Sequence, residues 1–205
     1  MTDFGFIHRF VPGASDYTLL LLHGTGGNQE SLISLGQKLA PEANLLSPRG
    51  QVLENGMPRF FRRLRVGIFD EQDIRLRAGE LKRFVAQAAE HYGLDQEKVF
   101  ALGYSNGANM GAALLLLHPG TLAGAVLLRP VLPLEPGTTP LLAGKKVFIA
   151  AGTKDPWAPI EKVEALVRLL QDSGCSVTPR WEPAGHELTE RELAGLQEWA
   201  SRHIP

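Results

Sequence analysis

Short apolar runs alternate with longer amphipathic segments along most of this chain. Mostly apolar runs of strand length occupy residues 18–22, 43–46, 99–102, 124–128 and 146–151, and a more polar strand is expected over 176–181. Apolar residues recur with helical spacing in residues 30–40, 73–92, 160–173 and 189–203. Residues 4–11 alternate loosely and are typical of an edge strand. Strands that alternate with helices predict an α/β fold, with a mostly parallel sheet, helices on both faces and right-handed crossovers.

The most informative stretch is residues 99–118, VFALGYSNGANMGAALLLLH. A buried strand runs into Gly103-Tyr104-Ser105-Asn106-Gly107, and a segment rich in alanine and leucine follows. Gly-x-Ser-x-Gly between a strand and a helix is the nucleophile-elbow pattern, in which the glycines allow a turn that side chains would obstruct. The pattern alone also arises by chance in glycine-rich turns, but the flanking strand and helix favour a reactive serine.

A serine at that position lies at the N-terminus of a helix. The first backbone N–H groups of a helix lack partners within it, and the helix dipole favours negative charge there. We therefore expect the backbone N–H of Asn106 to stabilise an oxyanion that forms beside Ser105.

A second glycine-rich turn, His23-Gly24-Thr25-Gly26-Gly27-Asn28, follows the strand at 18–22. It lacks the Gly-Lys-Ser/Thr ending of a phosphate loop and the Gly-x-Gly-x-x-Gly dinucleotide pattern, which disfavours nucleotide binding. A second oxyanion donor, the backbone N–H of Thr25, fits better. We expect His23 to hold the loop in place rather than to act as a base.

A serine nucleophile needs a base and an acid that orients the base. Asp155 and His186 follow the predicted strands at 146–151 and 176–181, so both should lie at the same edge of the sheet as Ser105. Rival acids and bases fit loops, helix caps or helices instead, namely Asp70, Asp73, His91, His118 and His203. The alternative is that Asp155 and His186 belong only to polar turns.

Residues 51–73 show little periodicity but contain several aromatic and arginine side chains. Such a segment is typical of a binding loop or lid, and a loop whose aromatic residues pack into the core is an equal alternative. We expect four side chains to contact a ligand: Phe60, Phe61, Arg129 and Trp157. Arg49, Arg63 or Arg129 could bind a carboxylate on a substrate, with Arg129 expected closest to the site, and each of the three is equally well explained as a structural salt-bridge partner.

Composition narrows the class of protein. The 205 residues have a formal net charge of −1, and the small cluster Arg62, Arg63 and Arg65 fits a solvated loop edge rather than a nucleic-acid surface. The single cysteine, Cys175, excludes an intrachain disulfide and fits a small buried side chain. No secretory leader or membrane-spanning run is evident. We expect one domain over 1–205 with a cytoplasmic location and no membrane insertion.

The motifs together resemble the phospholipase/carboxylesterase branch of the α/β-hydrolase superfamily, which includes acyl-protein thioesterases and esterases related to dienelactone hydrolases. The matching segments are 22–27, 103–108, 152–156 and 185–186. Ser47-Pro48-Arg49-Gly50 and Asn106 look more like the bacterial esterases, some of them linked to quinone or aromatic-compound responses, than like the thioesterases. The resemblance implies a fold without a large cap domain, acyl transfer to water without a metal or cofactor, and often a homodimer.

The resemblance also implies roles for the residues. Ser105 would attack an ester carbonyl, His186 would transfer the proton, Asp155 would hold the imidazole, and the N–H groups of Thr25 and Asn106 would bind the oxyanion. We therefore expect a serine carboxylesterase for small esters that works through an acyl-enzyme. A lysophospholipase or acyl thioesterase is the neighbouring alternative. A non-catalytic binding protein on the same fold is disfavoured because all three triad residues are present.

Overall fold

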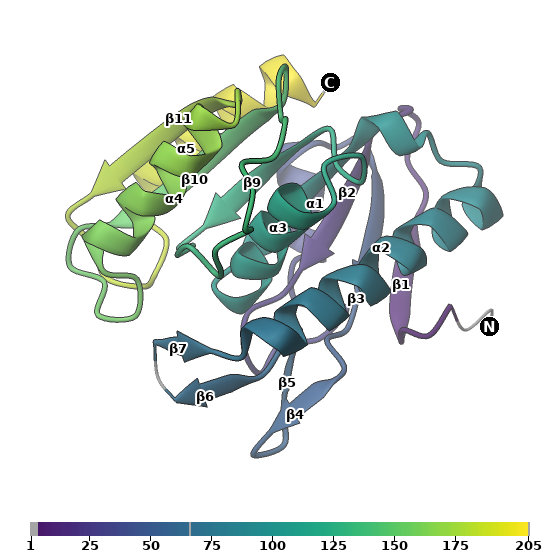
Figure 1. The fold of residues 1–205 in the computed structure, drawn as a ribbon. Helices are drawn as coiled ribbons and strands as arrows, with labels where there is room; N and C mark the ends of the chain where they lie inside the picture. Colours follow the sequence, from purple (N-terminus) through teal and green to yellow (C-terminus); the bar gives the residue numbers. More distant parts are fainter. Residues whose placement is uncertain (1–3, 66, 205) are drawn as a thin grey trace.

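A seven-stranded sheet in the order β1-β3-β2-β8-β9-β10-β11 forms the centre of the structure, a computed structural model that describes residues 4–65 and 67–204 (Figure 1). Its strands are β1 (His8–Val11), β2 (Thr18–Leu22), β3 (Asn44–Pro48), β8 (Val99–Tyr104), β9 (Gly124–Leu128), β10 (Lys146–Gly152) and β11 (Ser176–Glu182). Only β1 runs antiparallel to its neighbour in this sheet. The predicted parallel α/β architecture is therefore confirmed, with the expected edge strand.

Helices cover both faces of this sheet (Figure 1). On one face α1 (Ile33–Leu39) and α5 (Glu190–His203) pack over one hydrophobic cluster. On the other face α2 (Glu71–Tyr92), α3 (Asn106–Leu117) and α4 (Ile160–Asp172) cover a larger one. A short 3-10 turn, η1 (Gln96–Lys98), precedes β8. No helix in the described ranges has the length and apolar character that crossing a bilayer requires.

The predicted elements agree closely with the observed ones where the apolar pattern is strong. Strands β2 and β9 have the predicted bounds. Helix α2 begins two residues earlier than predicted, because the Asp70 carboxylate caps it by accepting a hydrogen bond from the backbone N–H of Asp73. Asp70 is thus a helix cap, as expected for this rival acid.

The segment 51–73 is more regular than the sequence pattern predicts. It forms two small hairpins, β4 (Val52–Glu54) with β5 (Met57–Arg59), and β6 (Arg63–Arg65) with β7 (Ile68–Phe69). These strands are too short to show periodicity. The Asn55-Gly56 pair at the first turn, with φ of 52° and 79°, is the signal that would have identified that hairpin.

Cys175 is buried, as expected for a small side chain that fills space in the core. Burial raises the pKa of its thiol to about 11, while the nearby Lys145 acts in the opposite direction. The thiol therefore stays protonated and unreactive at neutral pH.

Candidate active site

Ser105 occupies the sharp turn between β8 and α3, where the sequence pattern placed it. Its backbone has φ 52° and ψ −114°, a conformation that residues other than glycine rarely adopt. The turn is held by two hydrogen bonds: Ser105 N–H donates to the carbonyl of Leu128 at 2.8 Å, and Asn109 N–H donates to the carbonyl of Ser105 at 3.0 Å. The backbone strain thus falls on the serine itself.

The two elbow glycines are needed for close packing. A Cβ atom on Gly103 would lie 2.6 Å from the carbonyl oxygen of Gly107. A Cβ atom on Gly107 would overlap the backbone of Leu22 and His23 in the next strand and its loop. These contacts confirm the prediction that side chains at both positions would obstruct the turn.

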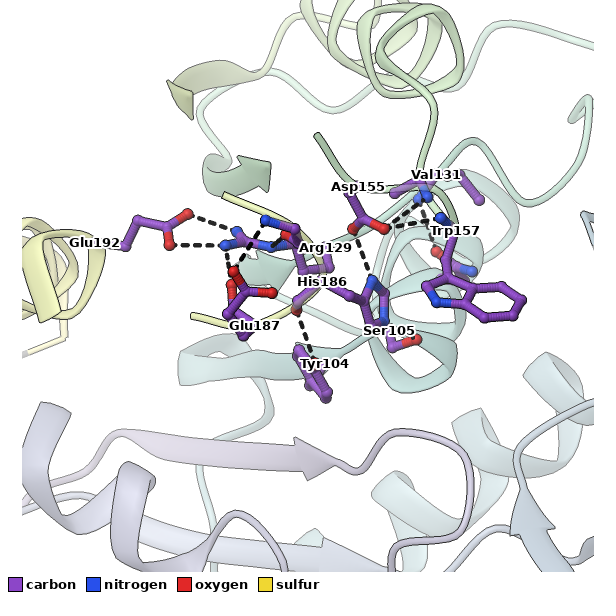
Figure 2. Close-up of polar contacts among 12 residues, drawn as sticks. Tyr104, Ser105, Arg129, Val131, Asp155, Trp157, His186, Glu187 and Glu192 are labelled. Atoms are coloured by element: carbon purple, nitrogen blue, oxygen red, sulfur yellow. Dashed lines mark hydrogen bonds and ion pairs between the residues drawn. The ribbon is translucent and has the colours of Figure 1, made fainter. Parts of the chain in front are cut away.

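The structure brings Ser105, His186 and Asp155 into one hydrogen-bonded chain (Figure 2). His186 Nε2 lies 2.9 Å from Ser105 Oγ, and His186 Nδ1 lies 2.7 Å from Asp155 Oδ2. A carboxylate only accepts, so Nδ1 carries the proton in neutral His186 and Nε2 is the acceptor for the serine hydroxyl. The other carboxylate oxygen, Asp155 Oδ1, accepts from the backbone N–H groups of Trp157 at 2.8 Å and Ala158 at 3.2 Å.

The rival candidates lie elsewhere in the structure. Asp73 lies in the first turn of α2, where its carboxylate accepts from the backbone N–H of Arg62. His91 packs against Phe4, His118 caps the C-terminus of α3, and the ring of His203 stacks on Trp199. None of these contacts involves Ser105.

The loop that carries His186 is fixed through three consecutive carbonyl groups (Figure 2). Arg129 Nε donates to the carbonyl of Gly185 at 3.0 Å, Tyr104 Oη donates to that of His186 at 2.8 Å, and Arg129 Nη2 donates to that of Glu187. Burial raises the pKa of Tyr104, which keeps its hydroxyl protonated as a donor. Tyr104 was recognisable only as the residue before the serine, so nothing in the sequence revealed this role.

The structure corrects the expected role of Arg129. Its side chain is fully buried, and Nη1 and Nη2 bind the carboxylate oxygens of Glu192 at 2.5 Å and 2.7 Å. The remaining bonds go to the His186 loop. Arg129 forms part of the wall of the cavity, but its guanidinium group is occupied by Glu192 and by the loop that carries His186. Arg129 is therefore a structural salt-bridge partner and not the ligand-binding residue that was expected.

A cavity of about 310 Å³ lies over Ser105 and His186. Trp157, which is 55% exposed, lines it as predicted, together with Thr25, Arg59, Arg63, Phe69 and Asn109. Phe60 and Phe61 do not line it: they are 3% and 0% exposed and belong to the hydrophobic core. The expectation that these two aromatic rings contact a ligand is therefore wrong, because the segment folds back as hairpins with both rings inward.

The glycine-rich loop after β2 is anchored from several sides. His23 Nδ1 donates to the carbonyl of Gly24 at 2.7 Å, and His23 Nε2 accepts from the backbone N–H of Gly50 at 2.9 Å. Arg59 Nη1 donates to Thr25 Oγ1 at 2.7 Å. His23 therefore holds the loop, as predicted, and Thr25 lies at the cavity with Asn106, the first residue of α3.

This arrangement makes His23 a source of acid sensitivity. Burial lowers the pKa of His23 below its ordinary value of 6.5, and Arg49 adds to the effect, while the hydrogen bond to Gly24 opposes it. The unfolded chain takes up a proton near pH 6.5 and the folded chain does so only at lower pH, so stability falls as pH drops below about 6.5. The contribution of His23 to this loss of stability is at most about 1.4 kcal/mol per pH unit. We expect the contribution to be absent in His23→Gln, whose stability should fall less steeply as the pH drops.

The measurement is the free energy of unfolding in urea at several pH values between about 5 and 7 for wild type and His23→Gln. Burial also lowers the pKa of His118, which is present in both proteins, so its contribution cancels in the difference. Parallel pH dependences would contradict the prediction.

Comparisons with known proteins identify the relatives of this chain. A family model described as Phospholipase/Carboxylesterase matches residues 13–204. The chain is 49% identical over 197 residues to the putative hydrolase MhqD of Bacillus subtilis (strain 168), covering 96% of this chain and 98% of that protein. The Bacillus cereus carboxylesterase superposes with a TM-score of 0.93 at 47% identity, over 96% of this chain and 93% of the other. A Mesorhizobium loti carboxylesterase does so with a TM-score of 0.91 at 34% identity, over 98% and 97%.

Proposed function

This chain belongs to the phospholipase/carboxylesterase family and is a hydrolase of the carboxylesterase type, and on that premise we propose that Ser105, His186 and Asp155 are its catalytic triad. The observation that carries the proposal is the continuous chain of hydrogen bonds from Ser105 Oγ through the imidazole to the Asp155 carboxylate. The strained backbone of Ser105, at the tip of the elbow beside the cavity, supports it.

In the proposed reaction Ser105 Oγ attacks the ester carbonyl carbon and His186 Nε2 takes the hydroxyl proton. Asp155 stabilises the imidazolium that results. The carbonyl oxygen becomes an oxyanion, which we assign to the backbone N–H groups of Thr25 and Asn106. When the intermediate collapses, His186 returns the proton to the leaving alcohol, and an acyl group stays on Ser105. Water then repeats the sequence and releases the carboxylic acid.

The cavity indicates small substrates. About 310 Å³ is at the lower end of the volumes that hold small-molecule ligands. Phe69, Tyr104 and Trp157 supply apolar walls on which a short acyl chain or an aromatic group would pack.

The test is hydrolysis of a p-nitrophenyl ester series from acetate to palmitate, with covalent labelling by a fluorophosphonate. We expect kcat/KM to peak at short acyl chains and the label to be found on the peptide that contains Ser105. A maximum at long chains would favour the lysophospholipase alternative. Absence of both turnover and labelling would refute the proposal and favour a binding protein on the same fold.

A further inference from the structure

The charged side chains around the cavity are unevenly distributed. Among the described residues that line it are three arginines, Arg59, Arg63 and Arg129, and no aspartate or glutamate. Arg129 is neutralised by Glu192 through two hydrogen bonds, and Asp155 lies behind His186. The charge balance of the cavity therefore depends on Arg59 and Arg63.

These two arginines share a single carboxylate. Glu54 Oε2 lies 3.2 Å from Arg59 Nε, and Glu54 Oε1 lies 2.7 Å from both Nε and Nη2 of Arg63. One negative charge thus faces two positive charges. We call Glu54, Arg59 and Arg63 the paired-arginine cluster. It carries one uncompensated positive charge at neutral pH.

The position of this cluster relates it to the reacting groups. Arg59 is buried at 3% exposure and reaches Thr25 Oγ1, on the loop proposed to bind the oxyanion. The Arg63 side chain is 25% exposed, and its Nη1 has no hydrogen-bonding partner within residues 4–65 and 67–204. Arg63 thus lines the cavity with unused capacity to donate hydrogen bonds, in surroundings that are partly shielded from water and strengthen its attraction for an anion.

We propose that the substrate is an ester that carries a carboxylate, which binds to the paired-arginine cluster through Arg63 while Ser105 attacks the ester carbonyl. The planar guanidinium fork matches a carboxylate, and Arg59 adds a second positive charge behind it. Monoesters of small dicarboxylic acids have this chemistry. The inference rests on the proposed function and adds the class of substrate to it.

The first experiment compares esters of equal chain length with and without the charge. Mono-p-nitrophenyl adipate and p-nitrophenyl hexanoate place the carboxylate or a methyl group on the acyl side. A carboxy-nitrophenyl butyrate and p-nitrophenyl butyrate make the same comparison on the alcohol side. We expect kcat/KM, corrected for uncatalysed hydrolysis, to be about 10- to 100-fold higher for the charged ester of at least one pair. Added salt should reduce this preference.

Variants then assign the preference to the cluster. Arg63→Gln leaves Glu54 and Arg59 as a neutral pair, so we expect the ratio of kcat/KM for the charged and neutral esters to fall about 10-fold or more. Arg63→Lys keeps the charge but not the fork, and should retain part of the preference. Arg65→Gln is the matched control, because this exposed neighbour lies on the same strand, outside the lining of the cavity, and should leave the ratio unchanged.

A preference for the neutral ester in both pairs would overturn the inference, and so would an equal loss of preference in Arg63→Gln and Arg65→Gln. Turnover that depends on Ser105 would leave the proposed function intact in either case. If none of the esters is hydrolysed, the proposed function fails and this inference fails with it.

Discussion

Replacing Ser105 with alanine is expected to lower kcat for p-nitrophenyl esters by about 10⁴- to 10⁶-fold. The alanine removes the atom that His186 Nε2 contacts at 2.9 Å and leaves no nucleophile for the acyl-enzyme. The residual rate would come from water attacking a substrate that is still bound and still polarised by backbone N–H groups. Steady-state kinetics with wild type and variant, on the short-chain ester that gives the highest kcat/KM, measure the effect.

Two controls separate lost chemistry from lost structure. Alanine at position 105 must adopt the same φ of 52°, so it keeps the strain, and the melting temperature should stay near that of the wild type. Ser105→Gly removes the nucleophile and also the strain, so it should be as inactive and more stable than Ser105→Ala by about 1–3 kcal/mol. Turnover that survives both substitutions would show that another residue is the nucleophile.

The sequence predicted the sheet and the shared position of Ser105, Asp155 and His186 at one edge of it, because both depend on local patterns. Strands buried in a parallel sheet are continuous apolar runs, and their C-terminal ends meet at one edge. Asp155 and His186 could therefore be placed beside Ser105 without knowledge of any contact. The capping box of α5, Thr189 with Glu192, is another local pattern, because its two residues lie three positions apart.

What the sequence could not show are pairings between distant residues. Arg129 and Glu192 are separated by 63 positions, and no residue near Arg129 in the sequence indicates that it pairs with a buried carboxylate. An arginine after a buried strand therefore resembled a substrate-binding residue. The direction of the side chains of Phe60 and Phe61 could not be predicted either. It depends on the short hairpins beside them, which show no periodicity in the sequence.

The buried pair of Arg129 and Glu192 should be among the most sensitive points for stability. The two side chains are 0% and 1% exposed, so removal of one leaves the other charged and desolvated. We expect Arg129→Met to lower the free energy of unfolding by about 3–5 kcal/mol. Urea unfolding measures the loss. The double variant Arg129→Met/Glu192→Gln should lose less than the sum of the two single variants, since neither charge is then left alone.

A kinetic readout tests whether Arg129 also positions His186. Arg129 holds the carbonyls of Gly185 and Glu187, on either side of the histidine. In Arg129→Met that loop loses these contacts, so we expect kcat to fall more than KM rises under conditions where the variant is fully folded. Unchanged kcat would show that Arg129 contributes to stability only.

The pH dependence of the Arg129→Met defect identifies its electrostatic origin. Burial alone would raise the pKa of Glu192, but hydrogen bonds from Arg129 and Thr189 outweigh it and hold this pKa below the ordinary 4.5. In wild type the pair therefore stabilises the fold above about pH 4.5, and this contribution is lost as pH falls through the lowered pKa. Without Arg129, burial should raise the pKa above 4.5, so protonation relieves the unpaired charge as the pH falls. The stability difference between wild type and Arg129→Met should accordingly narrow below about pH 5, whereas a defect due only to lost packing would stay constant with pH.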